Sequence, residues 1–169
     1  MFGCRFGSKV RYAKTTAAQM AARLQRKTST IGRMPPRYFT LEEANRTVDE
    51  LRPVVEEMVE HHGRFTTAQQ RRGELAEQAG ANGGDLTPTD FAEVEQELEA
   101  EARELARCVE RIQSAGALVK DLDRGLLDFP ALRDGEEILL CWHLGEDEIE
   151  YFHGTDEGFG GRKPLFGAD

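Results

Sequence analysis

The chain has 169 residues, of which 39% are hydrophobic and 31% charged, and its formal net charge is −9. This composition is typical of a soluble protein with one domain, or with one domain and an appendage. No apolar run approaches the roughly 20 residues that a membrane-spanning helix needs, so the sequence predicts no contact with a membrane.

The three cysteines, Cys4, Cys108 and Cys141, are odd in number and far apart in the sequence. No CxxC pair occurs, which argues against a zinc ribbon, a redox motif and a disulfide framework. A reducing compartment fits this use of cysteine best. We therefore expect the protein in the cytoplasm.

Charge is distributed very unevenly along the chain. Residues 1–40 contain nine Lys or Arg and no acidic residue, whereas residues 41–169 contain the other 13 basic and all 31 acidic residues, a formal charge of −18. Because such an acidic body repels phosphates, general binding of nucleic acid is disfavoured. We expect the partner to be another protein or a second copy of the chain.

Residues 1–33 show no sustained helical or strand period. They can be a targeting peptide, although the apolar centre of a secretory signal is missing, or a basic arm for nucleic acid or an acidic partner. They can also be a disordered basic extension, or a mis-called start with translation from Met34. A clear helix start follows Met34 within six residues, so we expect the folded unit to begin there.

A long helix is predicted from Leu41. Thr40 can cap it, and Glu43, three residues later, completes a capping box. Seam positions then recur at alternating spacings of three and four, as in a coiled coil, and turn polar towards the far end. They are Leu41, Ala44, Val48, Leu51, Val55, Met58, His62, Phe65, Gln69, Arg72 and Leu75. Pro53 should kink this helix.

A second helix is predicted after a turn at Gly80–Asp85, because Thr87 and Pro88 form a typical helix start. Its apolar positions again follow a coiled-coil spacing: Phe91, Val94, Leu98, Ala102, Leu105, Val109 and Ile112. Gly116 ends it. Two long helices joined by a short loop are antiparallel, so residues 34–116 are predicted to form a helical hairpin.

Beyond Gly116 the period changes to that of strands. The predicted strands are Ala117–Leu122, Leu126–Phe129, Ile138–Leu144 and Ile149–His153, with Pro130 ending the second. Residues 117–169 are therefore expected to form a small antiparallel β-meander of about four strands with a C-terminal loop. Since so small a sheet cannot bury itself, it should pack on the hairpin as one α+β unit.

Four segments of the chain resemble one bacterial family, which is catalogued as domain of unknown function 2203. They are Tyr38–Asn45 (YFTLEEAN), Val119–Pro130 (VKDLDRGLLDFP), Cys141–Glu146 (CWHLGE) and Gly158–Leu165 (GFGGRKPL). The resemblance covers about residues 37–165. It implies kinship, and it brings no activity, cofactor or partner that can be transferred to this chain.

No catalytic motif of a known class occurs, but one polar cluster is a candidate site. A turn at Gly145–Glu148 predicts that Leu144 faces Ile149, His143 faces Glu150 and Trp142 faces Tyr151. A two-residue turn at Asp134-Gly135 predicts that Cys141 faces Asp128. One face of the sheet would then carry Asp128, Cys141, His143 and Glu150. Such a set can bind a metal ion or transfer protons, or it can be a plain solvated face.

Two functions remain open from the sequence. The first is a non-enzymatic protein-interaction module without a cofactor, since two long helices make up much of the chain. The second is a small metal-dependent or acid–base enzyme with its site on the β-domain and a divalent metal ion as cofactor.

Overall fold

The structure is a computed structural model and describes residues 37–82 and 88–166. The chain divides into two compact units, Met1–Arg33 and Met34–Asp169, and every described residue belongs to the second. The predictions for residues 1–33 and for the turn and cap directly before Pro88 lie outside the described residues. In the ranges that are described, no helix has the length and apolar character needed to cross a membrane.

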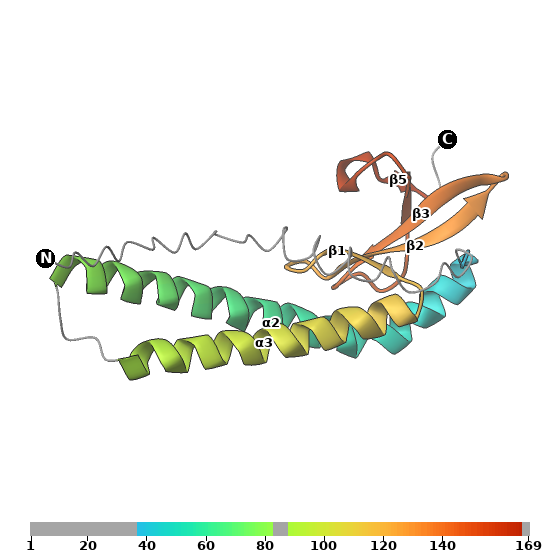
Figure 1. The fold of residues 1–169 in the computed structure, drawn as a ribbon. Coiled ribbons are helices and arrows are strands. Elements are labelled where there is room, and N and C mark those ends of the chain that lie inside the picture. Colours follow the sequence, from blue (N-terminus) through green and yellow to red (C-terminus); the bar gives the residue numbers. More distant parts are fainter. Residues whose placement is uncertain (1–36, 83–87, 167–169) are drawn as a thin grey trace, which may run out of the picture. The chain divides into compact units, whose positions relative to one another are not determined.

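Two long helices, α2 (Leu41–Asn82) and α3 (Pro88–Ser114), form the predicted hairpin (Figure 1). The capping box at the start of α2 is confirmed. The backbone N–H of Glu43 donates to the Thr40 hydroxyl at 3.2 Å, and the Thr40 N–H donates to the Glu43 carboxylate at 3.0 Å. Two donors that the helix cannot satisfy internally are thereby paired, which fixes where α2 begins.

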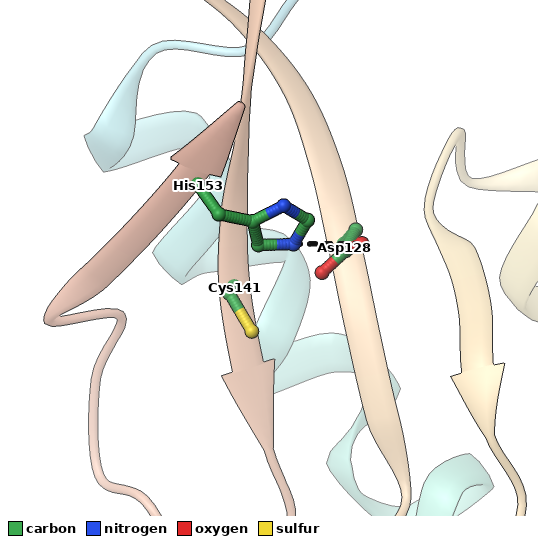
Figure 2. A group of neighbouring side chains, drawn as sticks. All are labelled: Asp128, Cys141 and His153. Carbon is green, nitrogen blue, oxygen red and sulfur yellow. Dashed lines mark ion pairs between the residues drawn. The ribbon is translucent and has the colours of Figure 1, made fainter. Parts of the chain in front are cut away.

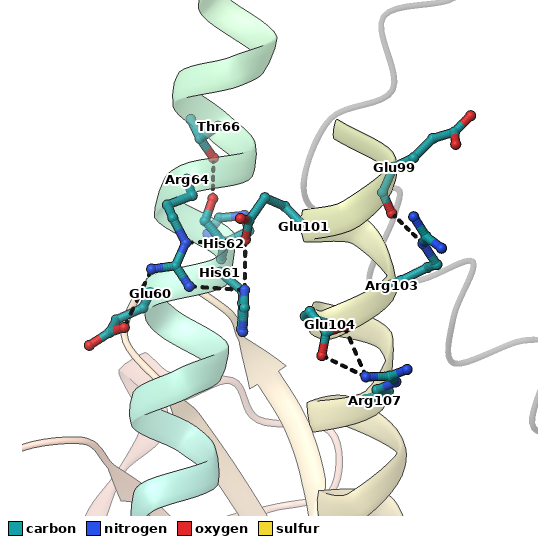
Figure 3. A network of polar contacts seen from close by, with 10 residues as sticks. All are labelled: Glu60, His61, His62, Arg64, Thr66, Glu99, Glu101, Arg103, Glu104 and Arg107. Atoms are coloured by element: carbon teal, nitrogen blue, oxygen red, sulfur yellow. Dashed lines mark hydrogen bonds and ion pairs between the residues drawn. The ribbon is translucent and has the colours of Figure 1, made fainter. Parts of the chain in front are cut away.

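The hairpin is held by an apolar seam near the sheet and by ion pairs farther out. The α2 seam is buried from Ala44 to Phe65, and Leu105 of α3 is fully buried. Beyond it, the seam positions Gln69 and Leu75 are only half-buried. There the helices are joined by ion pairs such as Arg71–Glu97 at 2.6 Å. Figure 3 shows the start of this polar part.

The second layer is an antiparallel sheet in the order β1-β2-β3-β4-β5. Its strands are β1 (Leu118–Asp121), β2 (Leu126–Arg133), β3 (Glu136–His143), β4 (Tyr151–Gly154) and β5 (Lys163–Pro164), and a short 3-10 helix, η1 (Phe159–Gly161), precedes β5. The predicted α+β class is confirmed. The sequence indicated about four strands, and the meander has five. The fifth, β5, was not predicted because it has only two residues and one of them is proline.

Pro130 does not end the second strand, as was predicted, but lies within β2 opposite Leu139. Its carbonyl accepts a hydrogen bond from the Phe39 N–H at 2.8 Å. The nitrogen and carbonyl of one strand residue point to the same side, so the nitrogen of Pro130 faces the Phe39 side. No donor is therefore missing from the ladder between β2 and β3, and the proline is tolerated.

The predicted register between the last two long strands was wrong by one residue. Tyr151 pairs with Cys141, and not with Trp142, and β4 begins only at Tyr151. The reason lies in the connection, where Ile149 was expected to extend the strand. The Ile149 N–H donates to the Asn45 side chain of α2 at 2.9 Å, so this part of the chain is bonded to the hairpin.

One face of the sheet meets the hairpin. Trp142 is fully buried with the Arg52 guanidinium of α2 5.3 Å from its ring centroid, and the rings of Phe39 and Phe129 pack edge to face at 5.3 Å. Since side chains alternate along a strand, neighbouring Asp128 and Cys141 point to the opposite face. That second face carries the candidate site.

Candidate functional site

Three strands bring one carboxylate, one thiol and one imidazole together on the second face. Asp128 of β2 lies directly opposite Cys141 of β3, as predicted, and His153 of β4 lies one diagonal step from Cys141. One potential ligand atom from each of these side chains lies within 4.8 Å of the other two. Figure 2 shows the His153 imidazole directed at the Asp128 carboxylate, with Cys141 on the strand between them.

The cluster is buried, although all three residue types are polar or reactive. The exposed fractions are 0% for Asp128, 0% for Cys141 and 2% for His153. The nearest cations to the Asp128 Oδ2 atom are His153 Nε2 at 3.2 Å, when that ring is protonated, and Lys120 Nζ at 3.5 Å. The third polar neighbour is the Cys141 thiol, which when protonated can donate a hydrogen bond to the carboxylate. Burying such a carboxylate costs on the order of several kcal/mol.

The orientation of His153 suits a metal ligand. Its Nδ1 atom lies 2.9 Å from the carbonyl oxygen of Gly154, which can only accept a hydrogen bond. Nδ1 must therefore carry the proton, and the Nε2 lone pair of the neutral ring is directed at the cluster. Histidines that bind metals usually have their other ring nitrogen fixed in this way.

The surroundings of Cys141 disfavour its thiolate form, so the thiol would lose its proton only beside a positive charge. Burial, together with the negative charge of Asp128, raises the pKa of the Cys141 thiol to about 12. Without a cation it is thus protonated at neutral pH and is a poor nucleophile. A metal ion would replace this proton, because thiols bind metals as thiolates.

Two of the predicted site residues lie outside the cluster. His143 is part of a separate network, in which its Nε2 atom lies 3.3 Å from Glu146 Oε1. Glu150 is exposed and precedes β4, because the register differs by one residue from the predicted one. Sequence reasoning missed His153 for the same reason. No local signal marked it, because the register depends on hydrogen bonds between the connection and α2.

The C-terminal segment covers the Cys141 side of the cluster. The Arg162 guanidinium donates to Glu146 Oε1 at 2.7 Å and lies 3.5 Å from the Cys141 carbonyl oxygen. The same guanidinium lies 4.4 Å from the centroid of the Tyr151 ring. Glu146 is in turn fixed from the hairpin, since Arg52 donates to its carbonyl oxygen at 3.1 Å. The cover is therefore anchored on both layers.

The described part of the chain is thus an α+β protein that carries a buried Asp–Cys–His cluster on the face of its sheet opposite the hairpin. The chain belongs to the family described as uncharacterized conserved protein (DUF2203), which matches residues 37–165. This finding confirms the resemblance found in the sequence. Searches of curated proteins and of solved structures found no match.

Proposed function

We propose that this protein binds one divalent transition-metal ion through Asp128, Cys141 and His153, and that zinc is the ion. The observation that carries the proposal is the fully buried Asp128 carboxylate, which lies beside a buried thiol and an oriented imidazole. Carboxylate oxygen, thiolate sulfur and imidazole nitrogen are common zinc ligands, and a tetrahedral arrangement needs four donor atoms. The second oxygen of Asp128 can be the fourth.

The role best supported for this ion is structural. Catalytic zinc sites keep a coordination position open to the substrate, whereas structural sites are closed. All three ligand residues are at most 2% exposed. We therefore favour a non-enzymatic protein in which the ion ties β2, β3 and β4 together. A reducing compartment such as the cytoplasm is part of this proposal, because Cys141 must stay reduced to bind zinc.

The test is the metal content and zinc affinity of the purified full-length chain. Wild type should hold one zinc per chain, and Cys141→Ser or His153→Gln should weaken binding by about 100-fold or more. Two matched variants control for general damage. Cys108→Ser removes the other buried free cysteine, and His143→Gln removes the histidine that was predicted to belong to the site.

The outcomes separate the possible sites. Wild-type binding in both control variants supports the three-residue site. Loss of binding in His143→Gln would favour the ligand set predicted from the sequence. Equal, weak binding by all five proteins would refute a metal site in this sheet. Magnesium should not compete with zinc, because it prefers oxygen ligands and avoids thiolates.

A second candidate function is binding of another protein by the far part of the hairpin. Figure 1 shows α2 and α3 extending well past the sheet, and their seam is only partly buried there. A Leu75→Glu variant should then lose a protein that wild type retains in affinity capture, with zinc binding unchanged. Sedimentation of the purified chain distinguishes self-association from a different partner. Retention of every captured protein by Leu75→Glu would argue against this surface.

A further inference from the structure

Lys120 links the buried carboxylate of the cluster to solvent by charge. Its Nζ atom lies 3.5 Å from Asp128 Oδ2, and its side chain is 41% exposed whereas that of Asp128 is 1% exposed. The Lys120 side chain can therefore move into water while the Asp128 carboxylate stays in place. No comparable freedom exists for His153, whose side chain is 2% exposed.

The local backbone directs this lysine to the cluster. Leu118 pairs with Asp128 and Val119 with Leu127, but the next pair joins Asp121 with Leu126. Lys120 is left without a partner at this irregularity, which is a β-bulge. Bulges change the direction of a side chain and are frequent beside functional sites. Because Leu118 pairs with Asp128 and side chains alternate along a strand, Lys120 lies on the face of Asp128, one diagonal step away.

The balance of charge in the cluster differs between the metal-free and the metal-bound protein. Without a metal ion, Lys120 balances the charge of Asp128. With a divalent ion bound, the Asp128 carboxylate and the Cys141 thiolate together already balance the ion. The ammonium group then becomes a surplus positive charge close to another cation. It also contacts the oxygen that the ion needs at about 2.0–2.2 Å.

We propose that Lys120 is an internal competitor of the metal ion for Asp128, and that it sets the metal affinity of the site. This inference rests on the proposed zinc function. The lysine holds the carboxylate while the site is empty and leaves for solvent when zinc binds. Removing its charge should therefore strengthen zinc binding, which is the opposite of what loss of a supporting residue does.

The experiment measures zinc affinity by competition with a chromogenic chelator in wild type and variants of the full-length chain. Lys120→Gln should bind zinc about tenfold more tightly or better, because one repulsive charge is removed. Lys120→Arg keeps the charge and should match wild type. Lys163→Gln is the matched control, since the ion pair of Lys163 in the same sheet is with Glu157, at 3.0 Å.

Failure of this inference and failure of the zinc site give different results. If wild type binds zinc and Lys120→Gln binds equally or more weakly, the competition is refuted and the zinc site stands. If neither protein binds zinc, both proposals fail. A third outcome is that Lys120→Gln binds zinc but wild type does not. If the double variant with Lys120→Gln and Asp128→Asn then fails to bind, the competition is supported, but the wild-type chain is not a zinc protein.

Discussion

Truncation of Leu105 to alanine tests how the hairpin is held together. Leu105 is 0% exposed and lies in the apolar part of the seam between α3 and α2. Replacing a fully buried leucine by alanine removes its transfer energy and leaves a cavity, which together cost about 2–5 kcal/mol. Leu75→Ala is the matched control, because the same truncation at this half-buried position should cost about 1 kcal/mol or less.

The assay is equilibrium unfolding in urea, followed by circular dichroism. With a slope of about 2 kcal/mol per molar urea, Leu105→Ala should lower the midpoint by roughly 1–2.5 M. The midpoint of Leu75→Ala should move by about 0.5 M or less. Equal shifts in the two variants would show that the hairpin is not tighter near the sheet than at its far end, and would refute the packing described above.

Three further predictions concern pH, reactivity and backbone conformation. Burial raises the pKa of Glu101, but hydrogen bonds from α2 outweigh it, so the pKa lies below its ordinary value. Glu101 therefore stabilises the protein above its unfolded pKa, and wild type should lose more stability than Glu101→Gln as the pH falls below about 4. Cys141, with a pKa of about 12, should resist iodoacetamide at pH 8 in the folded, metal-free protein and react after unfolding, as mass spectrometry can show. Gly125→Ala should cost about 1–3 kcal/mol more than Gly135→Ala in urea unfolding. Both glycines have positive φ, but only at Gly125 would the new Cβ meet another atom, Val55 Cγ1, at 2.6 Å.

The parts of the fold that sequence reasoning predicted are those set by local patterns. The Thr40–Glu43 capping box and the apolar seam of α2 need only neighbouring residues, and both are confirmed. The strand ends were harder, because they depend on tertiary hydrogen bonds. Pro130 continues β2 since its nitrogen faces the Phe39 segment, which is about 90 residues away in the sequence.

The candidate site could be predicted only in part, because its residues depend on the register of three strands. The tight turn at Asp134-Gly135 fixes the β2–β3 register locally, so Asp128 and Cys141 were placed opposite each other correctly. The connection from β3 to β4 is longer, and a slip of one residue exchanges the two faces of a strand. The slip replaced Glu150 by His153, whereas His143 lies at the end of β3 and contacts Glu146.

Contacts with the hairpin hold the connection that leads to β4, although the cluster lies on the other face of the sheet. Asn45 binds the N–H of Ile149 at 2.9 Å, and Arg52 binds the carbonyls of Glu146 and Asp147 at 3.1 and 3.0 Å. These bonds hold the connection against α2, so that β4 can begin only after it. The register that brings His153 towards Asp128 therefore depends on contacts made by the helices, and the structure of the cluster involves both layers of the protein.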